Sequence, residues 1–372
     1  MRILYYHQEH QTPMYLWQRV HFIDELARHG IEIDLINPLR YDTLELANQA
    51  VLETLRTTPY DLFMTPHNEE LLYIDTIQSI KKVGIPTLLI CFDNLLVPLT
   101  HRNVAKYFDL VWLTASENRE MFTKWGAKSI MLPYGANPYT FTYQAQPEVL
   151  RAAFVGSPYG SRVNMINALL TMDVPVSLYA NIHATNAGNG KANDTHSVPR
   201  QIDYLSTTLD YLTYPIGRKL LWAAAIQRLS PAARLMVGHP LLECHAPVPQ
   251  QEMESFYASY GLSLSSTTAR NTGILSTPVY VINLRAFEIP MCGGIQFCHY
   301  NPELANYFEE NREILFFRSD DEMAEKARFY LSEDRTSARQ TIRLAARRRA
   351  ESEHTWYHRF GKAFDALGIP YP

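Results

Sequence analysis

The strongest constraint on the fold is the regular alternation of short apolar runs with helical segments along residues 1–135. The run MRILYY is followed by a polar loop and then by MYLWQRVHFIDELARHG, whose apolar residues recur at helical spacing up to Gly30. Alternating strands and helices are typical of a doubly wound parallel sheet. We therefore expect one α/β domain of about six strands, whose later members are IEIDLINP, YDLFMTP, PTLLICFD, DLVWLTA and SIMLPYG.

A second alternating unit follows the irregular stretch ANPYTFTYQAQPE and opens with LRAAFVGS and a helix. With 372 residues, the chain is roughly twice the usual length of a single domain of ~100–200 residues. We expect domains at residues 1–138 and 139–352 that leave a cleft between them, and a C-terminal helix at 353–372 that packs back on the first domain. Residues 184–200, rich in Gly and Asn, predict a mobile surface loop.

Three local patterns lead to further expectations. The segment SENREMFTKWG predicts a helix capped by Ser116. VYVIN, residues 279–283, predicts a strand, and RAFEIPMC predicts a short helix that ends at the glycine pair 293–294. The arginine-rich RLAARRRAE lies on an amphipathic helix of an acidic protein, so it predicts a solvated face rather than a nucleic-acid surface.

Bulk composition narrows the class of protein. The net charge of −4 argues against nucleic acid or an anionic membrane as the main partner. No apolar stretch reaches the ~20 residues of a membrane span, and no signal peptide is evident, so we expect a cytoplasmic protein. The oligomeric state stays open. The cysteines are too irregularly spaced for a disulfide framework or a zinc site, and each is expected to be buried: Cys91, Cys244, Cys292 and Cys298.

The motif INLRAFEIPMCGG carries the most chemistry. Arg285 and Glu288 lie three positions apart and would be neighbours on a helix. They could form an exposed ion pair of little energetic value. Alternatively, Arg285 could bind a diphosphate while Glu288 accepts hydrogen bonds from a ribose diol. The spacing alone favours neither interpretation.

The first domain offers candidates for a general base. His7 and His10 follow the first expected strand, and an imidazole there could deprotonate an acceptor hydroxyl. Asp93 follows the strand PTLLICF and could do the same. Solvent-exposed histidines and a helix-capping Asp93 are equally acceptable interpretations, and His67 is a weaker candidate. His239 and His245 lack metal-ligand spacing, and we expect no bound metal.

Several motifs in order resemble a known family. AFVGSPYGSR, INLRAFE, NPELANYFEEN, DEMAEKARFY and HTWYHRF resemble the C-terminal half of CgeB-type bacterial glycosyltransferases, a branch of the group 1 enzymes of GT-B fold. The resemblance covers residues 130–165 and 240–365. It implies two Rossmann-like domains facing a central cleft, with the nucleotide-sugar donor held by the second and the acceptor by the first. It also implies catalysis without a metal.

The resemblance also assigns roles to individual residues. Gly156 and Ser157 match the loop beside the donor phosphates. Arg162 matches a basic residue that contacts the diphosphate, although a solvated position early in a helix is the alternative. Asn283, Arg285 and Glu288 match the nucleotide-binding motif, with Glu288 as the second of two glutamates eight positions apart. Tyr280 stands where the first glutamate would be, so the choice between an inverting and a retaining reaction stays open.

The expected function is transfer of a sugar from a nucleotide-diphosphate sugar to a hydroxyl acceptor. The donor, with UDP as the expected nucleotide, is a co-substrate, and no cofactor is expected. Two alternatives use the same fold: a nucleotide-sugar epimerase, which needs more carboxylates than Asp93 in the first domain, and a non-catalytic nucleotide-binding protein.

Overall fold

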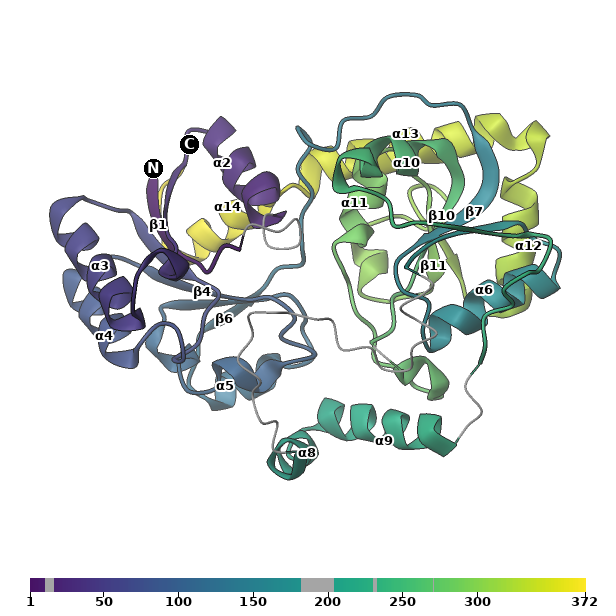
Figure 1. The fold of residues 1–372 in the computed structure, drawn as a ribbon. Helices are drawn as coiled ribbons and strands as arrows, with labels where there is room; N and C mark the ends of the chain where they lie inside the picture. Colours follow the sequence, from purple (N-terminus) through teal and green to yellow (C-terminus); the bar gives the residue numbers. More distant parts are fainter. Residues whose placement is uncertain (11–16, 182–203, 230–232, 270) are drawn as a thin grey trace. The chain divides into compact units, whose positions relative to one another are not determined.

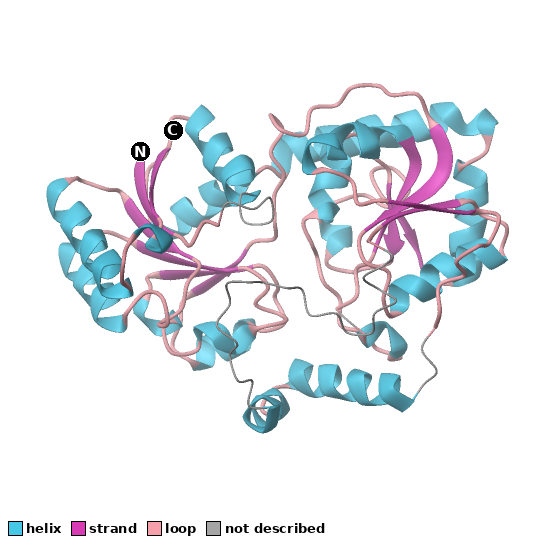
Figure 2. Cartoon of the chain, in the orientation of Figure 1, coloured by secondary structure: helices cyan, strands magenta, loops and turns pink. Residues whose placement is uncertain are grey.

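The computed structural model describes residues 1–10, 17–181, 204–229, 233–269 and 271–372. The chain forms two compact units, residues 1–141 with 351–372, and residues 142–350. Each unit has a parallel sheet with helices on both faces (Figures 1 and 2). The expected α/β class is confirmed, whereas the loop expected at residues 184–200 lies outside the described residues.

The first unit is built on a parallel sheet in the order β2-β1-β3-β4-β5-β6. Its strands are β1 (Arg2–Tyr6), β2 (Glu32–Ile36), β3 (Leu62–Thr65), β4 (Thr87–Cys91), β5 (Leu110–Leu113) and β6 (Ser129–Met131). Its helices include α2 (Asp24–Arg28), α3 (Leu44–Thr57), α4 (Ile74–Val83), α5 (Arg119–Lys124) and α14 (Trp356–Leu367). Short π- or 3₁₀-helical turns are η1 (Arg19–Ile23), η2 (Pro38–Arg40), η3 (Pro98–His101) and η4 (Ala105–Tyr107).

The central strands β3, β4 and β5 are buried on both faces, which explains why they are largely apolar rather than alternating. On β5, Val111 packs in the core formed with α3 and α4. The adjacent Trp112 points to the other face, where its ring centroid lies 5.0 Å from that of Phe360 on α14. Arg359 anchors the same helix by donating from Nε to the carbonyl of Tyr134, 3.0 Å away. The expected return of the C-terminal helix to the first unit is therefore confirmed.

The second unit has a parallel sheet in the order β12-β11-β10-β7-β8-β9. Its strands are β7 (Val149–Val155), β8 (Val176–Tyr179), β9 (Leu242–His245), β10 (Tyr260–Ser265), β11 (Gln296–His299) and β12 (Leu315–Phe317). Its helices include α6 (Ser161–Thr171), α8 (Tyr204–Leu212), α9 (Pro215–Leu229), α10 (Met253–Ser259), α11 (Arg285–Met291), α12 (Asp320–Tyr330) and α13 (Thr336–Glu353). Short 3₁₀ turns are η5 (Gln250–Glu252), η6 (Thr272–Ile274), η7 (Leu304–Asn306) and η8 (Glu333–Arg335).

The core of the second unit lies between its sheet and the pair α6 and α12. Figure 1 shows α10 and α13 on the other side of the sheet. There Arg343 of α13 is buried and donates to the carbonyls of Ala258, Tyr260 and Gly293 at 2.7–3.0 Å. Arg347, also buried, donates to the carbonyl of Met291. The predicted solvated face of this helix is therefore wrong, because carbonyls left unpaired at the ends of α10 and α11 need buried donors.

Three smaller expectations are corrected. Helix α5 begins after Asn118 rather than on a Ser116 cap. Residues 279–283 form only an isolated bridge, between Tyr280 and Thr268, instead of a strand. Cys244 is exposed on the edge strand β9, whereas the other cysteines are buried. Within the described ranges, no helix is both long and apolar enough to cross a membrane.

Candidate active site

The strand orders place one switch point in each unit. In the first sheet the chain reverses direction between β1 and β3, and in the second between β7 and β10. In open parallel sheets, ligands bind outside the carboxyl ends of the strands at such a point. In each unit, the loops that follow these strands are therefore the candidate ligand sites.

In the second unit, the loop after β7 brings Gly156 against Arg285. Gly156 has a φ of +128°, a backbone conformation that disfavours side chains. A Cβ built there would lie 3.5 Å from a terminal guanidinium nitrogen of Arg285. Two motifs separated by almost 130 residues in the sequence thus meet at the switch point.

Arg162 lies at the start of α6, directly after this loop. Its Nη1 donates to the carbonyl of Ser157 at 3.1 Å, and its guanidinium lies 4.3 Å from the ring centroid of Tyr159. Burial, together with the charge of Arg285, lowers the pKa of Arg162, while Tyr159 opposes the shift. Two guanidinium groups therefore share one side of the loop.

Arg285 keeps unused hydrogen-bonding capacity. Its Nε is buried and has no hydrogen-bond partner among the described residues. Burial alone would lower its pKa, but the neighbouring Tyr257 and Glu288 outweigh this effect and raise it. In the described part of the chain, neither Arg285 nor Arg162 forms an ion pair with a carboxylate, so both cations are available to an anionic ligand.

Glu288 is only 8% exposed, so the alternative of an exposed ion pair with Arg285 is wrong. Burial raises its pKa to about 7, and Arg285 partly opposes this shift. The carboxyl group therefore changes charge near neutral pH, beside the arginine expected to bind the phosphates.

Asn283 lies two residues before Arg285. Its Nδ2 donates to the carbonyl of Ser266, in the loop after β10, at 3.1 Å. Its Oδ1 is buried and accepts no hydrogen bond from the described residues. Buried polar atoms are rarely left without a partner, so this oxygen is a candidate contact for a ligand donor.

In the first unit, His7 follows β1 and is buried, at 5% exposure. The alternative of a solvent-exposed histidine is therefore wrong for His7. Its ring stacks between Tyr5 and His67, with centroid distances of 5.2 and 5.6 Å. Neither ring nitrogen finds a partner within the described residues. Burial lowers the pKa of His7 to about 4, so the imidazole is neutral at physiological pH.

His67, the weaker sequence candidate, joins His7 because β3 pairs directly with β1. Its Nε2 accepts a hydrogen bond from the Gln8 amide at 2.8 Å. His101 follows in η3, with Nε2 at 2.9 Å from the Pro66 carbonyl. Burial, followed by the nearby His7 and His101, lowers the pKa of His67. The sequence shows that histidines follow two expected strands. It does not show that these strands are neighbours in the sheet, which is what brings the histidines together.

The other two candidate bases of the first unit, Asp93 and His10, are less buried than His7. Asp93 is exposed, has a φ of +55°, and accepts a hydrogen bond from the Tyr134 hydroxyl at 3.2 Å. Among the described residues, Asp93 contacts neither of the two histidines and caps no helix. His10 is half-buried and its charge would lower the pKa of His7.

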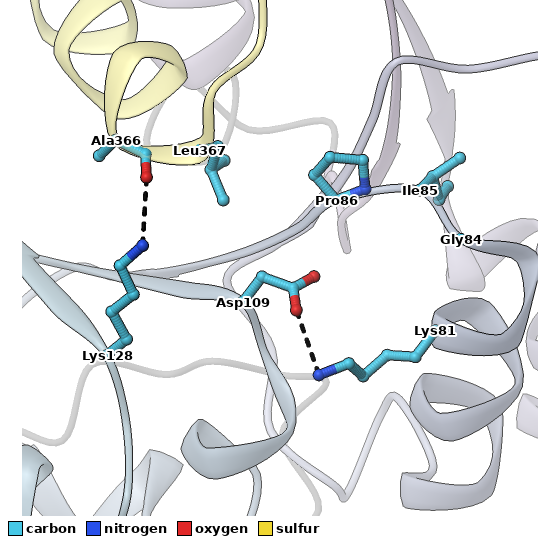
Figure 3. Close-up of a pocket in the computed structure, with 8 residues that line it drawn as sticks. All are labelled: Lys81, Gly84, Ile85, Pro86, Asp109, Lys128, Ala366 and Leu367. Carbon is cyan, nitrogen blue, oxygen red and sulfur yellow. Dashed lines mark hydrogen bonds and ion pairs between the residues drawn. The ribbon is translucent and has the colours of Figure 1, made fainter.

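A pocket of about 340 Å³ lies elsewhere in the first unit and is drawn in Figure 3. Its lining includes Pro86, Asp109 and Lys128, which immediately precede β4, β5 and β6. Lys81 pairs with Asp109 at 3.1 Å, and Lys128 donates to the carbonyl of Ala366 at 3.3 Å (Figure 3). This pocket is at the amino ends of the strands and its charged groups already have partners, so it is a poor candidate for the active site.

The described residues contain no group of three or more His, Cys, Asp or Glu side chains arranged to hold a metal ion. The second unit presents a cationic, glycine-containing loop with Arg162 and Arg285 beside it. The chemistry available in the first unit is that of a buried neutral imidazole.

The fold places this chain among proteins with the GT-B architecture of glycosyltransferases. HepE of Anabaena, solved with UDP, is 14% identical with a TM-score of 0.57, over 99% of this chain and 100% of that chain. A glycosyltransferase of Rickettsia africae is 8% identical with a TM-score of 0.59, over 98% and 97%. Sucrose-phosphate synthase of Thermosynechococcus elongatus is 12% identical with a TM-score of 0.54, over 99% of each chain. At these identities the likeness establishes the fold alone, and the expected GT-B fold is confirmed.

A family model adds information on the sequence. Residues 218–365 match a family described as glycosyl transferase-like. The match covers less than half of the chain and includes the motif with Arg285 and Glu288 as well as the C-terminal HTWYHRF. No curated protein sequence matches the chain. This family model agrees with the expected class, a glycosyltransferase.

Proposed function

We propose that this chain is a glycosyltransferase that transfers a sugar from a nucleoside-diphosphate sugar to a hydroxyl acceptor. The observation that carries the proposal is the convergence of Arg285 and Arg162 on the Gly156 loop, with no carboxylate paired to either among the described residues. Two guanidinium groups with free donors beside a side-chain-free backbone suit the two phosphates of such a donor.

The reaction proceeds by electrostatic stabilisation. As the bond from the sugar to the diphosphate breaks, negative charge grows on the departing phosphate oxygen. Arg285 and Arg162 stabilise that charge without needing to move, since their positions are fixed by packing and by the Ser157 carbonyl. Asn283, through its unpartnered Oδ1, and Glu288 bind hydroxyl groups of the donor.

The acceptor hydroxyl is activated by the first unit. His7 is neutral and has two ring nitrogens without a partner in the described chain, so it can accept a proton from a hydroxyl that reaches it. His67, stacked on His7, holds the ring in place. His10 and Asp93 remain secondary candidates for the base.

Uracil is the proposed base of the donor nucleotide. HepE of Anabaena was solved with UDP-glucose, and an α-glucosyltransferase of similar fold was solved with UDP. The motif order supports the CgeB-type branch as the subfamily. The free cysteines are compatible with a reducing compartment, and we propose a cytoplasmic location.

A nucleotide screen followed by a donor assay tests the proposal. We expect UDP, more than GDP or dTDP, to raise the melting temperature, and CMP, which carries a single phosphate, to have little effect. UDP-sugars should then be hydrolysed slowly and consumed faster when a hydroxyl acceptor is present. Conversion of the donor into a different nucleotide sugar would favour the epimerase. Failure of every diphosphate to bind would overturn the assignment of the arginine site.

A further inference from the structure

A surface outside the proposed active site has an unusual combination of side chains. Helix α9 of the second unit exposes Trp222 to 62% and Leu229 to 88%. The preceding helix α8, which packs against α9, exposes Leu209 to 57% and Leu212 to 48%. Each of these two packed helices thus exposes two large apolar side chains, more than the single scattered ones of an ordinary solvated surface.

The exposed residues of α9 form one stripe. At about 100° per residue, Arg218, Trp222, Ala225 and Leu229 lie within about 60° of one another around the helix. Ile216, Leu220 and Ala223, which are buried, lie on the opposite side. Helix α9 therefore has a buried apolar face and, on its opposite side, an exposed stripe that is apolar except for Arg218.

Basic residues accompany this stripe. Arg218, Lys219 and Arg228 are exposed, and Asp210 is the single acidic residue between positions 204 and 229. Arg218 and Lys219 donate to the carbonyls of Leu212 and Thr277, and none of the three pairs with a carboxylate in the described residues. The segment thus carries a local net charge of +2 in a chain whose net charge is −4.

We propose that the surface formed by α8 and α9 docks on an anionic lipid membrane. An aromatic anchor and leucines flanked by cations that have no carboxylate partner are the composition that binds at the headgroup boundary without spanning the bilayer. Trp222 occupies the interfacial zone, Leu229 reaches the acyl chains, and the cations contact lipid phosphates. The net charge of the whole chain does not indicate this partner, because the acidic residues elsewhere outweigh the local positive charge of residues 204–229.

Vesicle co-sedimentation of the full chain tests the proposal. We expect binding to vesicles of equimolar phosphatidylglycerol and phosphatidylcholine, weak binding to phosphatidylcholine alone, and loss of binding at high salt. Trp222→Glu with Leu229→Glu should weaken the partition coefficient by more than about tenfold. Arg218→Gln and Lys219→Gln should each weaken it about fivefold.

A matched control is available in the same unit. Phe329→Glu with Leu344→Glu replaces two other exposed apolar residues, on α12 and α13, and should leave vesicle binding unchanged. Thermal unfolding of each variant checks that the exposed substitutions leave the fold intact.

Three outcomes would overturn the proposal: no binding of the wild-type chain to anionic vesicles, equal binding to neutral vesicles, or full binding by the Trp222→Glu, Leu229→Glu variant. Light scattering adds a further outcome. A concentration-dependent dimer that this variant loses, without vesicle binding by the wild type, would assign the surface to a second copy of the chain. Donor binding is measured in parallel without lipid, so a failure here is distinguishable from a failure of the proposed function.

Discussion

The two switch points of this protein share a topology and differ in electrostatics. In the first unit, the loops after β1 and β3 bring together His7 and His67, whose pKa values are lowered by burial. In the second, the residues around the loop after β7 include Arg162 and Arg285, which remain charged. The same topology therefore carries a buried neutral imidazole in one unit and a pair of guanidinium cations in the other.

The difference shows which part of the arrangement comes from topology and which from side chains. Parallel strands that diverge leave open backbone at their carboxyl ends in both units. The residue types then decide the ligand, because imidazole loses its proton when desolvated while guanidinium keeps its charge. Substitutions that convert or remove these groups test the comparison directly.

The largest effect is expected from Arg285→Ala. Removal of the guanidinium beside Gly156 takes away a charge-assisted contact with the leaving diphosphate, so kcat should fall by roughly 10²–10³. Affinity for the nucleoside diphosphate should fall as well. Steady-state kinetics and calorimetric titration measure the two effects.

Arg312→Ala is the matched control for that variant. Arg312 is exposed in the same unit and pairs with Glu309 at 2.8 Å, so its loss should change activity less than twofold or so. Wild-type turnover in Arg285→Ala, with the fold intact by circular dichroism, would remove the cationic half of the comparison.

His7→Asn is expected to have the next largest effect. An amide cannot accept the acceptor's proton, so kcat should fall by roughly 10² while donor affinity stays unchanged. His29→Asn, which alters a histidine stacked on Tyr357 in the same unit, should retain activity. A matching loss in both variants would point to stability rather than to base catalysis.

The pH profile sharpens this test. Since the pKa of His7 is lowered to about 4, the neutral base form should prevail from pH 8 down to about 5. Protonation of His7 should therefore leave the wild-type kcat unchanged over that range and lower it toward pH 4. A decline centred near 6.5, the ordinary value for histidine, would contradict the buried imidazole as the base.

Much of this arrangement could be predicted from the sequence. The alternation of apolar runs and helices predicted the six strands of the first unit and the opening strand of the second, and the motifs placed Gly156 and Arg285 at the ends of elements where ligands bind. The meeting of Arg285 with Gly156 was implied only by family resemblance, because spacing along the chain carries no information on contacts between distant loops. The same limit hid Tyr257 of α10 as a neighbour of Arg285.

The sequence pattern led to a wrong prediction for two arginines of α13. A run such as RLAARRRAE indicates a solvated face by composition, and yet Arg343 and Arg347 are buried. Their partners include backbone carbonyls at the ends of α10 and α11, which no sequence composition reveals, and Arg343 also pairs with the Glu148 carboxylate at 3.2 Å. Buried arginines of this kind can be found only when the helix ends are located in space.

The smallest effects are expected from substitutions of two buried glutamates, one with a structural role and one at the proposed donor site. Glu25 in the first unit and Glu288 in the second both have pKa values raised to about 7, chiefly by burial. Glu25 accepts hydrogen bonds from the amides of Trp356 and Tyr357 at 3.1 and 3.0 Å, at the start of α14. Glu288 lies beside Arg285 at the proposed donor site. The same pKa thus accompanies two different roles.

Glu25→Gln and Glu288→Gln should share one pH-dependent change. A carboxyl group with a folded pKa above its unfolded value destabilises the fold as pH rises from about 4.5 to 7, so either substitution should stabilise at pH 8 relative to pH 5 by up to roughly 3 kcal/mol. Glu25→Gln should also lose about 1–3 kcal/mol at both pH values, because an amide accepts only one of the two backbone bonds. Glu288→Gln should instead weaken nucleotide binding about tenfold at pH 8, where the carboxylate is charged.

Urea unfolding at both pH values and calorimetric titration of UDP measure these changes. Unchanged UDP affinity in Glu288→Gln, or a weakened affinity in Glu25→Gln, would reverse the roles assigned to the pair.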